Sequence, residues 1–214
     1  MEMKNFNWMK TKRAAAFTLV ELLVVIAIMG IIASLIVGLA GKAADKKKKA
    51  RVGTELAQLE TAIESYKEKK GFYPPSNGNT TNAVPNQLFY ELTGTIFDPN
   101  NNEFQTVNGT EIINVTTISN SFGGVQGFAN SATAADRSEV KNFAIGLKST
   151  AEVIPGVEML VVPVAGPNDI DNGGRKFNPW RYNSSTPTHN PDSYDLWAEI
   201  VIGGKTNISG NWKE

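Results

Sequence analysis

The sequence has no cysteine and a single histidine among its 214 residues. Without cysteine the chain forms no disulfide bond, so an exported domain must be held together by packing alone. Zinc sites of the cysteine–histidine type and a cysteine nucleophile are excluded as well. We find no arrangement of residues for acid–base or nucleophilic chemistry, so the sequence favours a protein that is not an enzyme.

Neither sign of charge is in excess, because the chain has 21 basic and 21 acidic residues. This balance excludes a globally basic nucleic-acid-binding protein, and no nucleic-acid partner is predicted. The charges are unevenly placed, because none occurs between Glu21 and Lys42 and most side chains there are Leu, Ile, Val or Ala. About 20 such residues in a helix span roughly 30 Å, so we expect this segment to enter a lipid bilayer.

The composition divides the chain into four predicted parts. Residues 1–16 are a short basic leader, 17–41 the transmembrane half of a helix, 42–71 its amphipathic half, and 72–214 a globular head. All ten prolines lie in the last part. Within it, residues 76–155 match no pattern that we recognise, and we expect an enlarged loop region with a short helix over Gln87–Leu92 and a strand over Ile112–Ile118.

The amphipathic part reads as a helix. Apolar residues at steps of three and four form one stripe: Val52, Leu56, Leu59, Ile63 and Tyr66. The polar residues between them, including Glu55, are expected to face solvent. Gly71 stands where a C-terminal cap belongs, and Pro74-Pro75 prevent the helix from resuming. Because only glycines interrupt the chain before this point, we predict one helix from about 17 to 70.

Three runs of β-branched or aromatic residues in the head predict strands: Val157–Val164, Lys176–Asn183 and Asp195–Ile202. The predicted turns that punctuate them contain glycine: Gly166-Pro167, Asp171-Asn172-Gly173-Gly174 and Gly203-Gly204. We expect an antiparallel sheet that packs on the apolar stripe of the helix, which makes the fold class α+β.

The decisive segment is Ala14-Ala15-Ala16 followed by Phe17-Thr18-Leu19-Val20-Glu21-Leu22-Leu23. A secretory signal peptide has its small residues after the apolar run, and here they come before it. The order resembles the prepilin leaders of the type IV pilin and type II secretion pseudopilin superfamily. The resemblance implies cleavage between Ala16 and Phe17 and N-methylation of Phe17, although the family normally has Gly where this chain has Ala16.

The resemblance extends to the head, where three short motifs are similar to the major pseudopilin of type II secretion: Asn178-Pro179-Trp180-Arg181-Tyr182, Tyr194-Asp195-Leu196-Trp197 and Asn211-Trp212. It implies a pilin-like fold, with one long N-terminal helix packed on a small C-terminal antiparallel sheet with long loops. The implied function is a structural subunit of a pilus-like filament that aids protein export. The alternative within the superfamily is a type IV pilus subunit for adhesion, motility or DNA uptake.

Two residues of the apolar segment have implied roles in assembly. A carboxylate in the bilayer needs a partner, and in this family Glu21 would neutralise the N-terminal amine of a neighbouring subunit. The other reading of Glu21 is an interfacial residue that reaches the headgroups. Gly30 marks a point where family members melt the helix during assembly, or it is a helix–helix contact.

The resemblance also implies partners and a location. The partners are further copies of the chain, minor pseudopilins or pilins, prepilin peptidase, an inner-membrane assembly platform and, before assembly, the lipid bilayer. The precursor would cross the bacterial inner membrane once with its C-terminal head in the periplasm, and would then enter a periplasmic or cell-surface filament. A count of basic residues on each side of the apolar run favours the opposite orientation, and we give the leader motif precedence.

A calcium site is the one cofactor that the resemblance raises. Major pseudopilins commonly bind calcium between the Asp-Leu-aromatic motif and the final Asn-Trp. Here that segment, Glu199 to Ile208, contains Lys205 and no aspartate. Calcium prefers several oxygen ligands, mostly carboxylates, so we expect no cofactor, with Asp195 and Glu199 as the residues that calcium would use.

A function of another class stays open at this point. The chain is then a signal-anchored or secreted periplasmic binding module, whose Asn-rich loops hold a ligand. It would be cut after Ala40, where Gly38-Leu39-Ala40 fits a signal-peptidase site, or not at all. This reading leaves the match over Phe17–Leu23 to coincidence.

Overall fold

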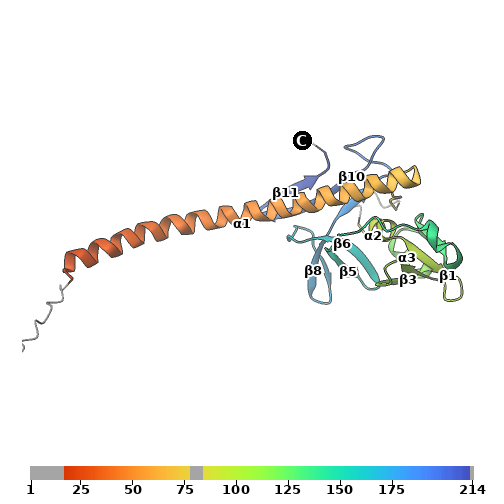
Figure 1. The fold of residues 1–214 in the computed structure, drawn as a ribbon, viewed down its shortest axis with the longest axis horizontal. Helices are drawn as coiled ribbons and strands as arrows, with labels where there is room; N and C mark the ends of the chain where they lie inside the picture. Colours follow the sequence, from red (N-terminus) through yellow and green to blue (C-terminus); the bar gives the residue numbers. More distant parts are fainter. Residues whose placement is uncertain (1–16, 78–83, 213–214) are drawn as a thin grey trace, which may run out of the picture. The chain divides into compact units, whose positions relative to one another are not determined.

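The computed structural model describes residues 17–77 and 84–212, and the chain divides into two compact units, residues 1–44 and 45–214. The predicted α+β class is confirmed, because a long N-terminal helix is followed by antiparallel sheets (Figure 1).

The helices are α1 (Leu19–Lys70), α2 (Leu88–Thr93), α3 (Val115–Ser121) and the 3₁₀ helix η1 (Ala134–Glu139). The strands are β1 (Thr95–Asp98), β2 (Glu103–Thr106), β3 (Ile112–Asn114), β4 (Ser131–Thr133), β5 (Thr150–Ile154), β6 (Val157–Val162), β7 (Ile170–Asn172), β8 (Arg175–Pro179), β9 (Arg181–Asn183), β10 (Asp195–Ile202) and β11 (Lys205–Gly210).

The C-terminal half of α1, yellow in Figure 1, supplies one side of the core of the second unit. Four members of the predicted stripe are buried and the fifth is partly buried: Val52, Leu59, Ile63 and Tyr66, with Leu56. They join a cluster that includes Leu160 of β6, Leu196 of β10 and Trp180. Each fully buried apolar side chain stabilises the fold by about 1.5–3 kcal/mol, so this stripe holds α1 on the sheets.

Both ends of α1 have a local cause. The helix begins at Leu19, two residues later than predicted, because Thr18 acts as its N-terminal cap. It ends at Lys70, as predicted, and Gly71 has a φ of 87° with its N–H donating to the carbonyl of Lys67 at 2.7 Å. Glycine adopts that left-handed conformation without the cost that a Cβ imposes.

Of the three strands predicted in the C-terminal part, one has the predicted bounds and two do not. β10 has the predicted bounds and lies between β9 and β11. The predicted strand over 176–183 is two strands, β8 and β9, because buried Trp180 lies between them and its N–H donates to the carbonyl of Leu160. β6 ends at Val162, two residues earlier than expected, and is followed by Pro163, which has no N–H for a ladder.

Two antiparallel sheets form this part of the head, ordered β11-β10-β9 and β5-β6-β8-β7. The turn predicted at Asp171 to Gly174 is confirmed, because it joins β7 to β8 with Asn172 paired to Arg175. The Gly203-Gly204 turn likewise joins β10 to β11, and both glycines have positive φ. Two-residue turns with positive φ at both positions match the twist of a hairpin.

Residues 76–155, expected to be mostly loops, contain a third sheet, ordered β3-β2-β1-β4, in which β1 and β4 are parallel. The strand predicted over Ile112–Ile118 is wrong in its second half, which is α3. Asn114 ends β3 because its side chain caps α3, accepting the N–H of Thr117 at 2.7 Å. The predicted helix over 87–92 is confirmed as α2, one residue later at each end.

Candidate assembly site at the N-terminal end of α1

The first turn of α1 holds Thr18 and Glu21 in a reciprocal hydrogen-bonded cap. The backbone N–H of Glu21 donates to the Thr18 hydroxyl at 3.2 Å. In return, one carboxylate oxygen of Glu21 accepts the Thr18 backbone N–H at 2.9 Å and its hydroxyl at 2.8 Å. This is a capping box, which satisfies two N–H groups that have no partner within the helix. Glu21 therefore has a local partner within its own chain.

Sequence reasoning missed the role of Thr18. The signal was present, because a threonine followed three residues later by a glutamate, just before an apolar run, is the pattern of a capping box. The prediction considered what Glu21 would meet in a neighbouring subunit or at the headgroups, and not its own helix. The structure adds that Glu21 also shapes the start of its own helix.

The described part of the first unit exposes its apolar side chains all around the helix. All side chains from Phe17 to Ile36 are exposed, including those of Leu22, Ile26 and Met29. Within the described residues, α1 is the one helix long and apolar enough to cross a membrane. Exposed apolar surface of this extent marks an interaction with lipid or protein.

The other predicted processing and assembly residues are placed as follows. Phe17 precedes α1 and is exposed, and Gly30 lies within the helical run of α1 with no heavy atom near its would-be Cβ. Ala16 lies outside the described residues. The basic side chains that follow the apolar segment, Lys42, Lys46–Lys49 and Arg51, are exposed on α1.

Asp195 and Glu199, the residues that calcium would use, are not brought together. They are four positions apart on β10, roughly 13 Å along a strand. Glu199 accepts a hydrogen bond from the side chain of Asn168 at 3.1 Å and lies 3.5 Å from Nη2 of Arg181. Among residues 17–77 and 84–212, no cluster of three or more histidine or acidic side chains suits a metal ion.

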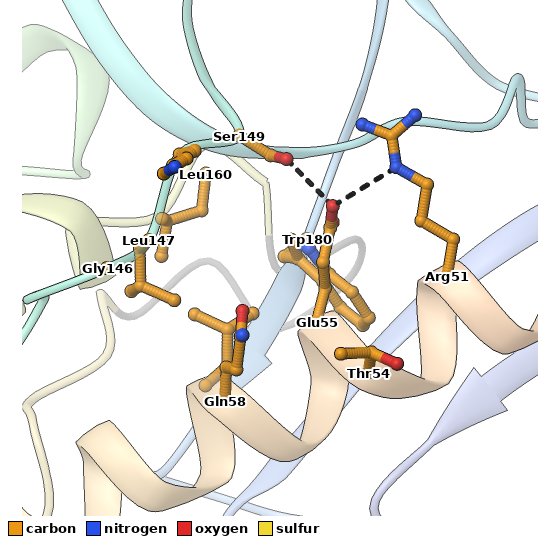
Figure 2. Close-up of a pocket in the computed structure, with 11 residues that line it drawn as sticks. Arg51, Thr54, Glu55, Gln58, Gly146, Leu147, Ser149, Leu160 and Trp180 are labelled. Carbon is orange, nitrogen blue, oxygen red and sulfur yellow. Dashed lines mark hydrogen bonds and ion pairs between the residues drawn. The ribbon is translucent and has the colours of Figure 1, made fainter.

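A hollow of about 420 Å³ lies between α1 and the loop before β5 (Figure 2). Glu55 points into it, and its carboxylate accepts the Ser149 hydroxyl at 2.8 Å and lies 3.7 Å from Nε of Arg51. Burial raises the pKa of Glu55, although Ser149 and Arg51 lower it. The expectation that Glu55 faces solvent is therefore wrong, because loop residues 146–149 cover this side of the helix.

The polar groups of the hollow are engaged with one another. Its lining contains no histidine or cysteine, and the Ser149 hydroxyl donates to Glu55, whose carboxylate also lies beside Arg51. The contacts of Glu55 serve to fix the loop to the helix.

The comparisons with known proteins agree with the geometry of the first unit. Residues 11–37 match the family model of the prokaryotic N-terminal methylation motif. The chain is 31% identical to type II secretion system core protein G of Klebsiella michiganensis over 129 residues, which cover 56% of this chain and 91% of that protein. It is 32% identical over 111 residues to the core protein G of Escherichia coli K12, covering 47% of this chain and 77% of that protein. No solved structure is significantly similar. With the methylation motif, the exposed apolar helix and a relative matched over nearly its whole length, the chain belongs to the type II secretion pseudopilins, in the family of core protein G.

Proposed function

We propose that this pseudopilin is a structural, non-enzymatic subunit of a periplasmic pilus-like filament that serves type II secretion. The observation that carries the proposal is the methylation motif over residues 11–37, which includes the start of α1, where every apolar side chain up to Ile36 is exposed. Such a helix needs lipid before assembly and other helices afterwards. The same segment thus anchors the precursor and later forms the filament core.

Cleavage and methylation of the precursor produce the subunit that assembles. In this proposal residues 1–16 are a leader on the cytoplasmic side, and prepilin peptidase cuts between Ala16 and Phe17 and methylates Phe17. Ala16 is the smallest step up from the usual Gly, so we expect cleavage to proceed. Residues 17–41 then remain in the inner membrane, and the head, residues 72–214, lies in the periplasm.

Assembly then uses Glu21. The carboxylate lies at the start of the apolar segment, where an ionised group without a partner is costly. In the filament the N-terminal amine of a neighbouring Phe17 would neutralise it and set the axial stagger between copies. Gly30, which has no side chain to stiffen the helix, is where α1 would adapt its backbone to neighbouring helices. The further partners would be minor pseudopilins and the inner-membrane assembly platform.

The test separates the two roles of Glu21. Glu21→Gln keeps an oxygen that accepts the Thr18 N–H, since glutamine also serves in a capping box, but it removes the charge. Glu21→Ala removes both. We expect both variants to be cleaved and methylated, and both to lose the filaments that can be sheared from cells expressing the wild type. Glu103→Gln, the same change on β2 of the head, is the matched control and should assemble.

The alternatives predict other results. Filaments formed by Glu21→Gln at the wild-type level would contradict charge neutralisation and leave helix capping as the role of Glu21. Filaments formed by Glu21→Ala as well would contradict the proposed filament mechanism itself.

A further inference from the structure

The C-terminal end of the head is the place where this chain departs from what its family implies. The family implies calcium between the Asp-Leu-aromatic motif and the final Asn-Trp. In this chain that segment is the hairpin of β10 and β11, in which Glu199 pairs with Ile208 and Ile202 pairs with Lys205. Calcium takes six to eight oxygen ligands from a loop that can wrap around it. Carbonyl oxygens that face the partner strand of a hairpin are not free to do so.

The carboxylate of Asp195 is also unsuited to bind calcium. Its Oδ2 accepts the backbone N–H groups of Thr188 at 2.6 Å and His189 at 2.9 Å, and its Oδ1 accepts that of Asn190 at 2.9 Å. The side chain of Asn190 also donates to Oδ1 at 3.2 Å. Both oxygens thus face N–H donors, which carry the positive end of a dipole and occupy the directions in which a cation would sit.

These donors also act on the charge of the group. Burial would raise the pKa of Asp195, but the N–H donors of His189, Thr188 and Asn190 outweigh it and hold the pKa below its usual value. Charge-assisted hydrogen bonds of this kind are about twice as strong as neutral ones. Both carboxylate oxygens are therefore satisfied by N–H donors of the protein itself.

The end of the chain is fixed to this loop by a second set of contacts. Oδ1 of Asn211 accepts the backbone N–H of Leu196 at 2.9 Å and the amide of Asn190 at 3.2 Å, while its Nδ2 donates to the carbonyl of Tyr194 at 2.9 Å. Trp212 stacks on the imidazole of His189, with ring centroids 3.9 Å apart and planes 3° from parallel. Asp195 and Asn211 thus hold the loop 188–190 from two sides.

We infer that the C-terminal segment of this pseudopilin is held by a metal-free lock, in which Asp195 and Asn211 bind the loop 188–190 directly, so that calcium is not needed for its folded head. The residues do not fit the ion: Asp195 faces donors, Glu199 pairs with Arg181 and Asn168, and Lys205 adds a positive charge to the segment. The inference is independent of the filament role, because it concerns the isolated subunit.

The first experiment compares full-length protein in detergent micelles in excess calcium and in EGTA, with thermal unfolding followed by tryptophan fluorescence. A calcium concentration of about 10 mM exceeds the Kd of even weak extracellular calcium sites at least tenfold. We expect the two Tm values to agree within about 1 °C, whereas a bound ion would raise Tm by about 3 °C or more. A rise of that size overturns the inference.

Hydrogen exchange tests the lock without a mutation. In EGTA the amides of Thr188, His189, Asn190 and Leu196 should be as protected as they are in calcium, because their acceptors are side chains of the protein. Exchange at the rate of a free peptide in EGTA overturns the inference.

A pair of variants tests the role of the carboxylate. Asp195→Asn replaces one accepting oxygen by an amide that faces N–H donors, so Tm should fall by about 5 °C or more, equally in calcium and in EGTA. Asp192→Asn is the matched control, since it makes the same change in the same loop at an exposed position whose φ of 68° asparagine tolerates. An unchanged Tm for Asp195→Asn would overturn the lock.

Discussion

Glu91 is a fully buried carboxylate that joins three segments of the head. It accepts the hydroxyl of Tyr66 on α1 at 2.9 Å and the backbone N–H groups of Ala129 and Asn130 at 2.8 and 3.0 Å. Burial raises its pKa from the ordinary 4.5, although these three donors and the charge of Lys70 lower it. The group is thus satisfied geometrically and still costly to ionise.

This position gives a pH dependence with a definite sign. Because the folded pKa of Glu91 is raised, the folded state keeps a proton that the unfolded state releases just above pH 4.5. The stabilisation is complete below that pH and is lost as the pH rises through the folded pKa. Glu91→Gln should remove this slope and lower the free energy of unfolding by about 1–3 kcal/mol, since its amide faces a backbone N–H.

The measurement is denaturant unfolding of the full-length chain in micelles between pH 4.5 and 8. Glu139→Gln, the same change at an exposed position of η1, is the control and should leave the slope unchanged. A Glu91→Gln variant with the wild-type slope would show that Glu91 does not titrate in this range.

At the scale of the element, Gly53 within α1 and Gly71 directly after it lead to opposite predictions for substitution by alanine. Gly71 ends the helix with a φ of 87°, and Gly53 lies within it, and neither would-be Cβ meets another atom within 4 Å. Backbone conformation alone therefore decides the sign. Gly71→Ala should destabilise the head by about 1–2 kcal/mol, and Gly53→Ala should stabilise it by about 0.5–1 kcal/mol.

Chemical unfolding of the two variants beside the wild type measures both effects, and each variant serves as the control for the other. Equal signs would contradict the assigned end of α1 at Lys70.

The N-terminal cap of α1 is tested by Thr18→Ala. Losing an N-cap side chain costs about 1 kcal/mol, so the first-turn amides, including that of Glu21, should exchange about fivefold faster in micelles. Thr18→Ser keeps the hydroxyl and should exchange at the wild-type rate. Thr61→Ala removes a hydroxyl that bonds the carbonyl of Ala57 and caps nothing, so it should not change exchange at the N-terminus. Unchanged exchange in Thr18→Ala would contradict the capping box.

Long periodic elements could be predicted from the sequence, and short ones could not. The apolar stripe from Val52 to Tyr66 repeats over four turns, and β10 alternates between buried and half-buried side chains over the seven residues from Leu196 to Ile202. By contrast, β1, β2 and β4 have three or four residues each, too few for a period to appear. Their pairing depends on contacts with distant residues, such as that of Phe104 with Phe128.

The residues of the candidate site were likewise predictable only where the signal lies in a contiguous stretch of sequence. Phe17, Glu21 and Gly30 stand in a contiguous motif and could be named from it, while the exposure of Glu55 was mispredicted because a loop over 80 residues away covers it. The Asp195 contacts are local in sequence, but they involve the backbone N–H groups of Thr188 to Asn190, which side-chain identities do not reveal.

The whole molecule combines two units that need different surroundings. The first exposes its apolar side chains from Phe17 to Ile36, and the second buries its apolar core. Only a membrane or a bundle of helices satisfies the first, and water satisfies the second. This two-unit organisation is what the proposed filament subunit requires, an apolar assembly helix joined to a water-facing head.

The mature N-terminus tests the proposed function most directly. Mass spectrometry of the N-terminal peptide, from membrane fractions and from sheared filaments, should find a chain that begins at N-methylated Phe17. A chain that still begins at Met1, or one that begins at Gly41 after cleavage by signal peptidase, would contradict it.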